Sequence, residues 1–139
     1  MSMSLFVILA LDIEPNTNEL NTAAKELGYA VQYTQNVELK KHSGFLPAKF
    51  ESKDSGMETY SFSVSELPDT FKSQVPVKYA QGYVYQLKFG GNPIEAQMVF
   101  TTAIIMSAKY NGITIEDQSG TLLNSEQLVE ALPYFMGML

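Results

Sequence analysis

The sequence is poor in the side chains that most often carry out chemistry. It has no arginine, no cysteine and no tryptophan, and His42 is its single histidine. Arginine is suited to bidentate phosphate recognition, cysteine supplies thiolates and most zinc sites, and histidine is the usual acid or base near neutral pH. The aromatic, carboxylate and amide side chains that remain favour a binding protein over an enzyme.

The missing cysteines exclude disulfides and thiol redox chemistry, and they fit a cytoplasmic location. An apolar run at residues 5–11 has no lysine before it and is followed directly by Asp12. The run is therefore too short for a membrane span and wrongly flanked for a signal peptide. We expect a cytoplasmic protein in which this segment is a buried strand.

The chain is acidic, with 15 acidic and 9 basic residues and a net charge of −6. Phosphate backbones and anionic lipids are bound through lysine and arginine, so we expect neither nucleic acid nor membrane as a partner. A basic protein suits this charge better. A length of 139 residues with 45% hydrophobic side chains is enough for one core, and it predicts a single domain over residues 1–139.

The hydrophobic pattern predicts an α+β fold: a largely antiparallel sheet of about six strands with two to three helices packed on one face. Strands are expected at residues 5–11, 29–33, 44–50, 57–65, 82–89 and 113–116. One helix follows Asn16 and ends at Gly28, a second spans residues 93–110, and a third is capped by Asn124. The connection at residues 66–81 is expected to be irregular, with one helical turn at most.

Periodicity also predicts which side chains face the core. The 93–110 helix is apolar over so much of its surface that it must lie at the centre of the core. In the 57–65 strand the apolar positions alternate with Thr59 and serines, which is typical of a sheet with one solvent-facing side. Pro133 is expected to distort the end of the last helix. The positions predicted to face inward on the first and last helices are Leu20, Ala23, Ala24, Leu27, Leu128, Val129, Leu132 and Phe135.

Two motifs with a possible chemical role have simpler structural explanations. His42 follows Lys40 and Lys41 on what should be an exposed turn, where no carboxylate is available to orient it as a general base. The glycine-rich stretch at residues 90–93 precedes a helix, as a phosphate-binding loop does. However, Pro93 removes one of the amides that would bind an anion, and Glu95 adds negative charge, so a helix cap is expected.

The carboxylates form two candidate groups for acid/base work or cation binding: Glu51, Asp54 and Glu58, and the pair Glu116 and Asp117. Adjacent residues of a strand point to opposite faces, the spacing does not fit a calcium-binding loop, and a transition metal would need a histidine ligand. We therefore expect no metal, no cofactor and no small-molecule substrate. The same acids are well suited to the rim of a surface that docks a basic protein.

Three short stretches carry a resemblance to a known group of proteins: residues 42–47 (HSGFLP), 55–60 (SGMETY) and 115–120 (IEDQSG), the last followed by a short closing helix. The chain resembles the small α+β immunity proteins that bacteria carry beside polymorphic or contact-delivered toxins. The resemblance implies a cytoplasmic protein that is not an enzyme and that binds one cognate toxin, blocking its active site or substrate path. It carries over no functional residues, because the toxin-facing surface varies with the toxin.

The sequence thus predicts an immunity protein that neutralises a cognate toxin, a basic nuclease being the expected target. Two alternatives stay open: a small enzyme that uses a carboxylate pair or His42, and an adaptor or structural module. The predicted toxin-facing residues are Glu51, Asp54, Glu58, Tyr60, Tyr83, Glu116 and Asp117. The other possibility for these residues is that Tyr60 and Tyr83 lie in the core and the acids are merely solvated.

Overall fold

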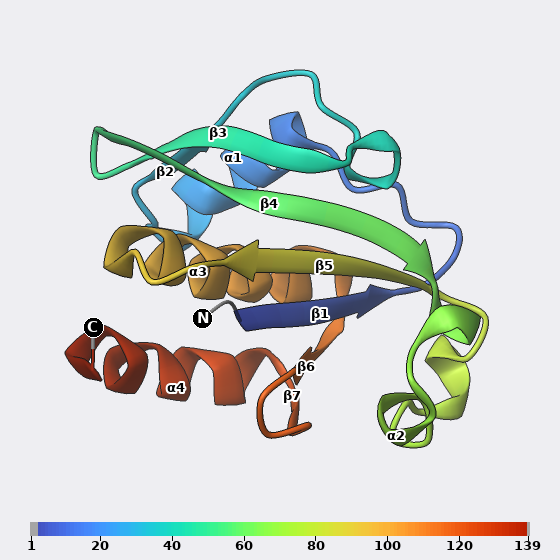
Figure 1. Cartoon of the computed structure of the whole chain (residues 1–139). Helices are drawn as coiled ribbons and strands as arrows, with labels where there is room; N and C mark the ends of the chain where they lie inside the picture. Colours follow the sequence, from blue (N-terminus) through green and yellow to red (C-terminus); the bar gives the residue numbers. More distant parts are fainter. Residues whose placement is uncertain (1–2, 139) are drawn as a thin grey trace.

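The protein is built on an open antiparallel sheet of seven strands, in the order β2-β3-β4-β5-β1-β6-β7 (Figure 1). The computed structural model describes the backbone of residues 3–138 and the side chains of residues 3–133. The strands are β1 (Met3–Leu9), β2 (Val31–Tyr33), β3 (Gly44–Phe50), β4 (Lys53–Ser63), β5 (Tyr83–Phe89), β6 (Ile113–Glu116) and β7 (Leu122–Leu123). The helices are α1 (Thr17–Leu27), α2 (Asp69–Lys72), α3 (Pro93–Tyr110) and α4 (Ser125–Met138).

The predicted α+β class is confirmed, with differences in the bounds of several elements and one additional strand. The first strand spans Met3–Leu9 instead of residues 5–11, so Leu11 lies outside it and is exposed. The strand not expected from the sequence is β7, a two-residue partner of β6. Helix α4 continues past Pro133, the residue at which the sequence predicted a distortion, to Met138. Phe135, predicted to face inward, lies outside the residues whose side chains are described.

Asparagine side chains define where the helices start. The Oδ1 of Asn16 accepts a hydrogen bond from the Glu19 amide at 2.9 Å, and Gly28 ends α1 in the left-handed region with φ 84°. The Oδ1 of Asn92 accepts hydrogen bonds from the amides of Ile94 and Glu95, which makes residues 90–93 the helix cap that the sequence predicted. Such caps satisfy amides that have no partner within the helix.

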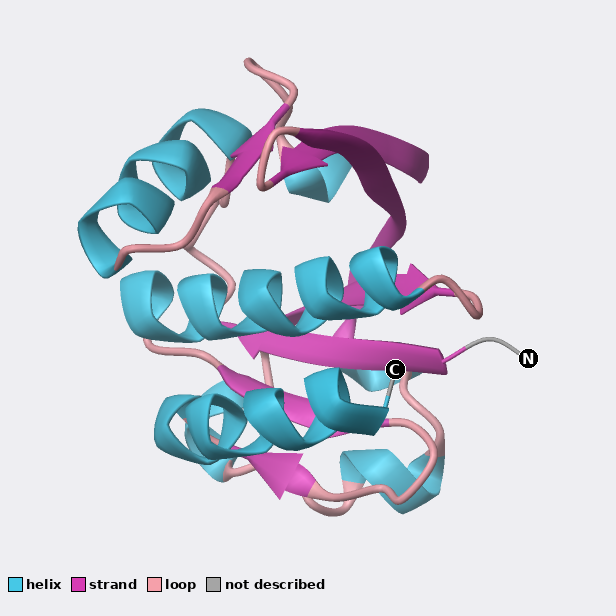
Figure 2. Ribbon diagram, turned by 90° about the vertical axis from the view of Figure 1, so that its left-hand side faces the viewer, coloured by secondary structure: helices cyan, strands magenta, loops and turns pink. Residues whose placement is uncertain are grey.

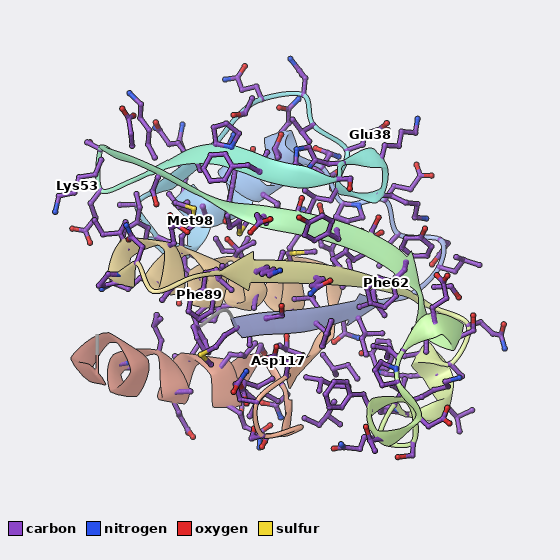
Figure 3. All side chains as sticks on the ribbon, in the orientation of Figure 1. Glu38, Lys53, Phe62, Phe89, Met98 and Asp117 are labelled. Carbon is purple, nitrogen blue, oxygen red and sulfur yellow. The ribbon has the colours of Figure 1, made fainter. Side chains whose placement is uncertain are left out.

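Helices α1, α3 and α4 cover one face of the sheet, with α3 between the other two (Figure 2). As predicted, α3 is the centre of the main core: Met98, Phe100 and Ile105 are completely buried. The ring of Phe100 meets Phe89 of β5 edge-on, with 6.3 Å between ring centroids. Phe89 and Met98 are labelled in Figure 3, where all side chains are drawn. Packing on this face therefore joins the longest helix to the middle of the sheet.

A second, smaller core lies on the other face of the sheet, at one end only. Residues 64–82, which include α2 and two 3₁₀ turns, fold over this end and bury Val64, Leu67 and Tyr79. The ring of Phe6 on β1 lies 5.7 Å from the ring of Phe71 on α2. The helices are therefore not confined to one face, because α2 lies on the opposite side. No helix among residues 3–138 covers the rest of that face.

Strand β4 turns its aromatic residues away from the large helices, contrary to the expectation that its serine and threonine side would face solvent. Thr59 lies opposite Leu87 in register, faces the main core and is 2% exposed. Tyr60 and Phe62 lie on the other face, where they are half-buried. Alternation separates two faces of a strand, but it does not say which of them a helix will cover.

Candidate functional site: the open face of the sheet

The part of the sheet that residues 64–82 leave uncovered is the candidate functional surface, and we call it the open face. Directly opposite residues in an antiparallel pair share a face, and the register places Phe45, Glu58, Lys88 and Ser4 side by side across β3, β4, β5 and β1. Figure 3 looks onto this side of the sheet, with Phe62 toward the covered end. The side chains of the open face are those of Phe45, Lys49, Asp54, Glu58, Tyr60, Gln86, Lys88 and Asp117.

Phe45 is the most prominent apolar group on this surface, with 54% of its side chain exposed. Its ring lies across Gly56 of the neighbouring strand, where a Cβ atom would meet Phe45 Cζ at 2.2 Å. The absence of a side chain at Gly56 is thus what lets the aromatic ring lie flat on β4. The sheet holds an exposed aromatic group in a defined position.

Beside Phe45, the side chains of Glu58 and Tyr60 are joined to each other. The Tyr60 hydroxyl donates a hydrogen bond to Glu58 Oε1 at 2.7 Å. This bond to the carboxylate is the main cause that raises the pKa of Tyr60 above its usual value, and partial burial and the charge of Glu58 act in the same direction. Both residues are half-buried and ordered by the same contact.

The open face carries charges of both signs. Asp54 lies opposite Lys49, and Glu58 lies opposite Lys88 in register. The ion pairs found among the described side chains lie elsewhere, between Glu38 and Lys41 and between Asp69 and Lys72. Of the charged groups on this face, Lys49 and Asp54 are exposed, whereas Glu58, Lys88 and Asp117 are half-buried.

Of the two adjacent acids Glu116 and Asp117, only Asp117 belongs to the open face. Its amide donates a hydrogen bond to the Ser4 carbonyl at 3.1 Å, which adds it to the end of the row that starts at Phe45. Glu116 points the other way and is 6% exposed. Its carboxylate accepts hydrogen bonds from the amides of Gln118 and Ser119, at 2.9 and 2.7 Å, and so holds the β6–β7 turn. The sequence did not reveal this structural role.

Tyr83 and Tyr60 do not share a surface. Tyr83 lies on the helix side of β5, where it packs against the main core and where the Lys40 ammonium sits 4.9 Å from its ring centroid. Tyr60 lies on the opposite side of the sheet, as the pairing of the two strands requires. The sequence assigned both tyrosines to the toxin-facing surface as aromatic anchors, but the strand register places them on opposite sides of the sheet.

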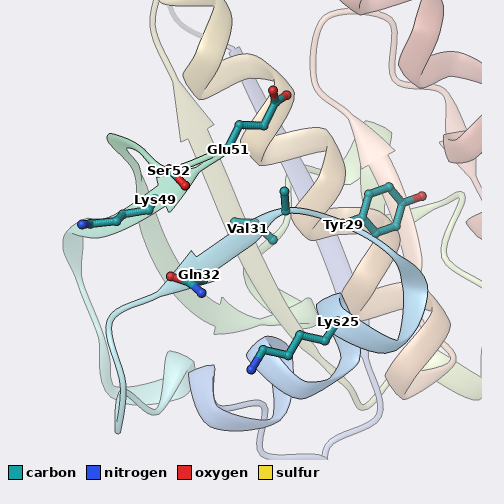
Figure 4. Close-up of a pocket in the computed structure, with 8 residues that line it drawn as sticks. Lys25, Tyr29, Val31, Gln32, Lys49, Glu51 and Ser52 are labelled. Carbon is teal, nitrogen blue, oxygen red and sulfur yellow. The ribbon is translucent and has the colours of Figure 1, made fainter.

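Glu51 lies at the tip of the β3–β4 hairpin, at one end of the open face. It is exposed and has a left-handed backbone, with φ 51°, as has Ser52 with φ 67°. It borders a hollow of about 200 Å³ beside β2, shown in Figure 4, with Lys25 and Lys49 on either side. The hollow combines acidic, basic and aromatic groups and has no convergent set of catalytic side chains.

His42 is half-buried, in contrast to the exposed position expected from its neighbours. Its Nδ1 lies 2.7 Å from the hydroxyl oxygen of Thr59, a residue that faces the main core. The turn brings the ring against the end of the sheet instead of into solvent. Its hydrogen-bonding partner is therefore a hydroxyl and not the carboxylate that would orient a general base.

Among the described residues, no three histidine or carboxylate side chains come together in a way that could hold a metal ion. No helix in the described part of the chain is long and apolar enough to cross a bilayer. Comparison with protein-family models, with curated proteins and with solved structures finds no match to this chain. The resemblance to immunity proteins therefore remains a hypothesis, and the function is argued from the surface itself.

The prediction that the protein requires no metal or cofactor can be tested by thermal unfolding. We expect the same Tm in EDTA, in excess Mg²⁺ or Ca²⁺, and with ATP or NAD, because the carboxylates of Glu58 and Glu116 already hold local hydrogen bonds. A ligand at about 100 times its Kd would stabilise the folded state by about 2.7 kcal/mol. A rise of several degrees with any of these additions would contradict the prediction.

Proposed function

We propose that the protein is a cytoplasmic immunity-type inhibitor that binds a cognate toxin through the open face of its sheet. The observation that supports this most directly is the exposed Phe45 ring held against Gly56, next to the ordered pair of Glu58 and Tyr60. Well-positioned aromatic groups surrounded by polar side chains are the usual composition of protein–protein interfaces. The open face thus offers an anchor and a rim on a rigid support.

Binding through the face is better supported than binding through a sheet edge. The two edge strands are short, with β2 spanning Val31–Tyr33 and β7 spanning Leu122–Leu123. Strand addition needs a longer row of unpaired backbone groups. The side chains of β3, β4 and β5 offer a broader contact.

The mechanism of such an inhibitor is occlusion, not chemistry. The net charge of −6 attracts a basic protein. The open face adds the carboxylate of Glu58 beside Phe45, that of Asp54 opposite Lys49, and that of Asp117 at the far end of the row. If the toxin is a nuclease, these carboxylates can occupy the cleft that binds phosphate, so the substrate is excluded while the complex lasts. The protein acts by binding and not by catalysis, since its candidate carboxylates hold local hydrogen bonds or are dispersed over the surface.

The decisive experiment is co-expression with the product of the neighbouring reading frame. We expect a stoichiometric complex that survives size-exclusion chromatography and a toxin whose activity falls in proportion to the amount of inhibitor added. A failure to form any complex with that product, with both proteins folded, would overturn the proposal.

Loss of the aromatic anchor should weaken toxin binding. The double variant Phe45→Ser, Tyr60→Ser should raise the Kd at least about thirtyfold, as removal of interface anchors worth about 2 kcal/mol does. Val77→Ser is the matched control, because Val77 is 91% exposed but lies on the 64–82 segment, outside the open face. Isothermal titration calorimetry measures the Kd of the toxin for each of the two variants. Equal losses in the two proteins would mean that the open face is not the interface.

The acidic residues on and beside the open face should increase the rate at which the protein associates with a basic toxin. Neutralising Glu51, Asp54 and Asp117 together, as Gln, Asn and Asn, should slow association about three- to tenfold at low salt and reduce its salt dependence. A control that neutralises the exposed acids Asp12, Glu66 and Asp69 changes the net charge equally at other places. Stopped-flow kinetics of the two variants separates local from overall charge. If the control slows association as much, electrostatic steering does not depend on the open face.

A further inference from the structure

Two side chains that helical periodicity assigns to the core are instead exposed, and both border the same groove. Leu27 at the end of α1 is 46% exposed, and Val129 on α4 is 47% exposed. Other members of the same predicted stripes, such as Leu20 on α1 and Leu128 on α4, are fully buried. We call this depression the helix groove; it is lined by Leu27, Tyr29, Ile104, Ala108, Ser125, Glu126, Val129 and Glu130.

The three large helices form the groove. The last turn of α1 is one wall, the first turns of α4 are the other, and α3 lies between them (Figure 2). Ile104 and Ala108, one helical turn apart on α3, form the floor, and the small side chain of Ala108 keeps that floor low. The groove has a volume of about 400 Å³, and a neighbouring hollow of about 200 Å³ shares Leu27 and Ala108 with it.

The charge of the groove is negative on one side. Glu126 and Glu130 of α4 are exposed and lie four residues apart, so their side chains are neighbours on the same side of that helix. Like charges at this spacing repel each other. None of the described residues that line the helix groove is cationic. A basic group placed here would relieve the repulsion, and the apolar walls would cover aliphatic side chains.

We propose that the helix groove is a docking site for a basic amphipathic helix of a partner protein. Such a helix would lay apolar side chains at i, i+3, i+4 and i+7 against Leu27, Ala108 and Val129. Lysines or arginines on its flank would meet Glu126 and Glu130. The groove is on the opposite side of the sheet from the open face, so this site does not rest on the proposed toxin-binding function and both surfaces can be occupied together.

The test uses a defined probe, a fluorescein-labelled peptide of leucine and lysine with leucine at amphipathic helical spacing. A second peptide has the same composition in an order that breaks the period. We expect fluorescence anisotropy at low salt to show binding of the amphipathic peptide to the full chain and at least about tenfold weaker binding of the scrambled one. Equal binding of the two peptides would overturn the proposal.

Variants of the exposed groove residues locate the site. Leu27→Ser with Val129→Ser should weaken peptide binding at least about tenfold. Val77→Ser, which also removes an exposed apolar group, should leave binding unchanged. Ala108→Lys is a second variant, which fills the floor and adds a repelling charge while keeping a good helix former. Unchanged binding in both groove variants, or an equal loss in Val77→Ser, would refute the assignment.

Two further measurements separate this proposal from its competitors. Glu126→Gln with Glu130→Gln should reduce both the affinity at low salt and its salt dependence, whereas Phe45→Ser should change neither. Sedimentation of the wild-type protein tests whether a second copy occupies the groove. A dimer that Leu27→Ser and Val129→Ser dissociate would show that the occupant is this chain itself, and the proposed partner helix would be wrong.

Discussion

Replacing Phe100 with alanine should lower the free energy of unfolding by about 3–5 kcal/mol, as the loss of a large buried aromatic side chain does. Phe100 is completely buried at the centre of α3, and its ring meets Phe89 of β5 edge-on. The surrounding elements are a long helix and the middle of a sheet, which relax little around a cavity. Urea denaturation with an unchanged m-value measures the loss.

Ile104, four residues from Phe100 on α3, should give a smaller loss of stability when replaced by alanine. It is 2% exposed and forms part of the groove floor, so Ile104→Ala should cost about 2–5 kcal/mol and fall toward the lower end of that range. Val77→Ala at a 91% exposed position serves as the control and should change stability by less than about 0.5 kcal/mol. Losses under about 1 kcal/mol at both Phe100 and Ile104 would contradict the placement of α3 in the core.

Replacing Gly82 with alanine should destabilise the protein by about 1–3 kcal/mol, because the added methyl group has no room. A Cβ atom there would lie 2.4 Å from the Leu9 carbonyl oxygen and 2.9 Å from that of Tyr79. Both are backbone atoms, which cannot rotate aside as a side chain can. Gly82 also donates a hydrogen bond to Tyr79 and accepts one from Val64, so a shift would disturb the junction between residues 64–82 and β5.

Gly91 provides the matched control for this substitution. A Cβ atom at Gly91 meets no atom within 4 Å, and its φ does not lie in the left-handed region. Gly91→Ala should therefore change stability by less than about 0.5 kcal/mol. Thermal and urea unfolding of the two variants side by side distinguishes the close approach at Gly82 from a general effect of removing glycine. Equal stability of the two variants would contradict the prediction, because it would mean that the backbone of β1 and β5 can move apart to accommodate a methyl group at position 82.

Local chemistry in the sequence determined where elements start, where they stop and which side chains share a face. Asn16 and Asn92 accept the amide hydrogen bonds that begin α1 and α3, and Asn111, with φ 56°, ends α3. The alternation along β5 puts Tyr83, Tyr85, Leu87 and Phe89 on one side, and all four pack in or against the main core. These features depend on residues within a few positions of each other, so a single sequence contains them.

The candidate site was predictable only in part. Asp54, Glu58, Tyr60 and Asp117 lie on one face, as a shared patch requires, but Tyr83 and Glu116 belong to the other side. Phe45 was missed, although it is the most exposed aromatic side chain of the open face. The sequence feature that could have revealed Phe45 is Gly56, whose missing side chain leaves room for the ring. That relation becomes visible only when the register places the two residues on adjacent strands.

The tertiary structure alone decided which surfaces are covered. Hydrophobic periodicity and helix caps determine which way side chains point relative to their own helix or strand. Whether another element covers those side chains depends on segments that are distant in sequence and pack together. Helix α3 buries the Thr59 side of β4 and leaves Tyr60 on the open face. Leu27 and Val129 satisfy the same periodicity as their buried neighbours, yet α1 and α4 reach beyond the area that α3 and the sheet can cover. The sequence therefore determined the elements and their amphipathic stripes, and packing determined which parts of those stripes were left exposed.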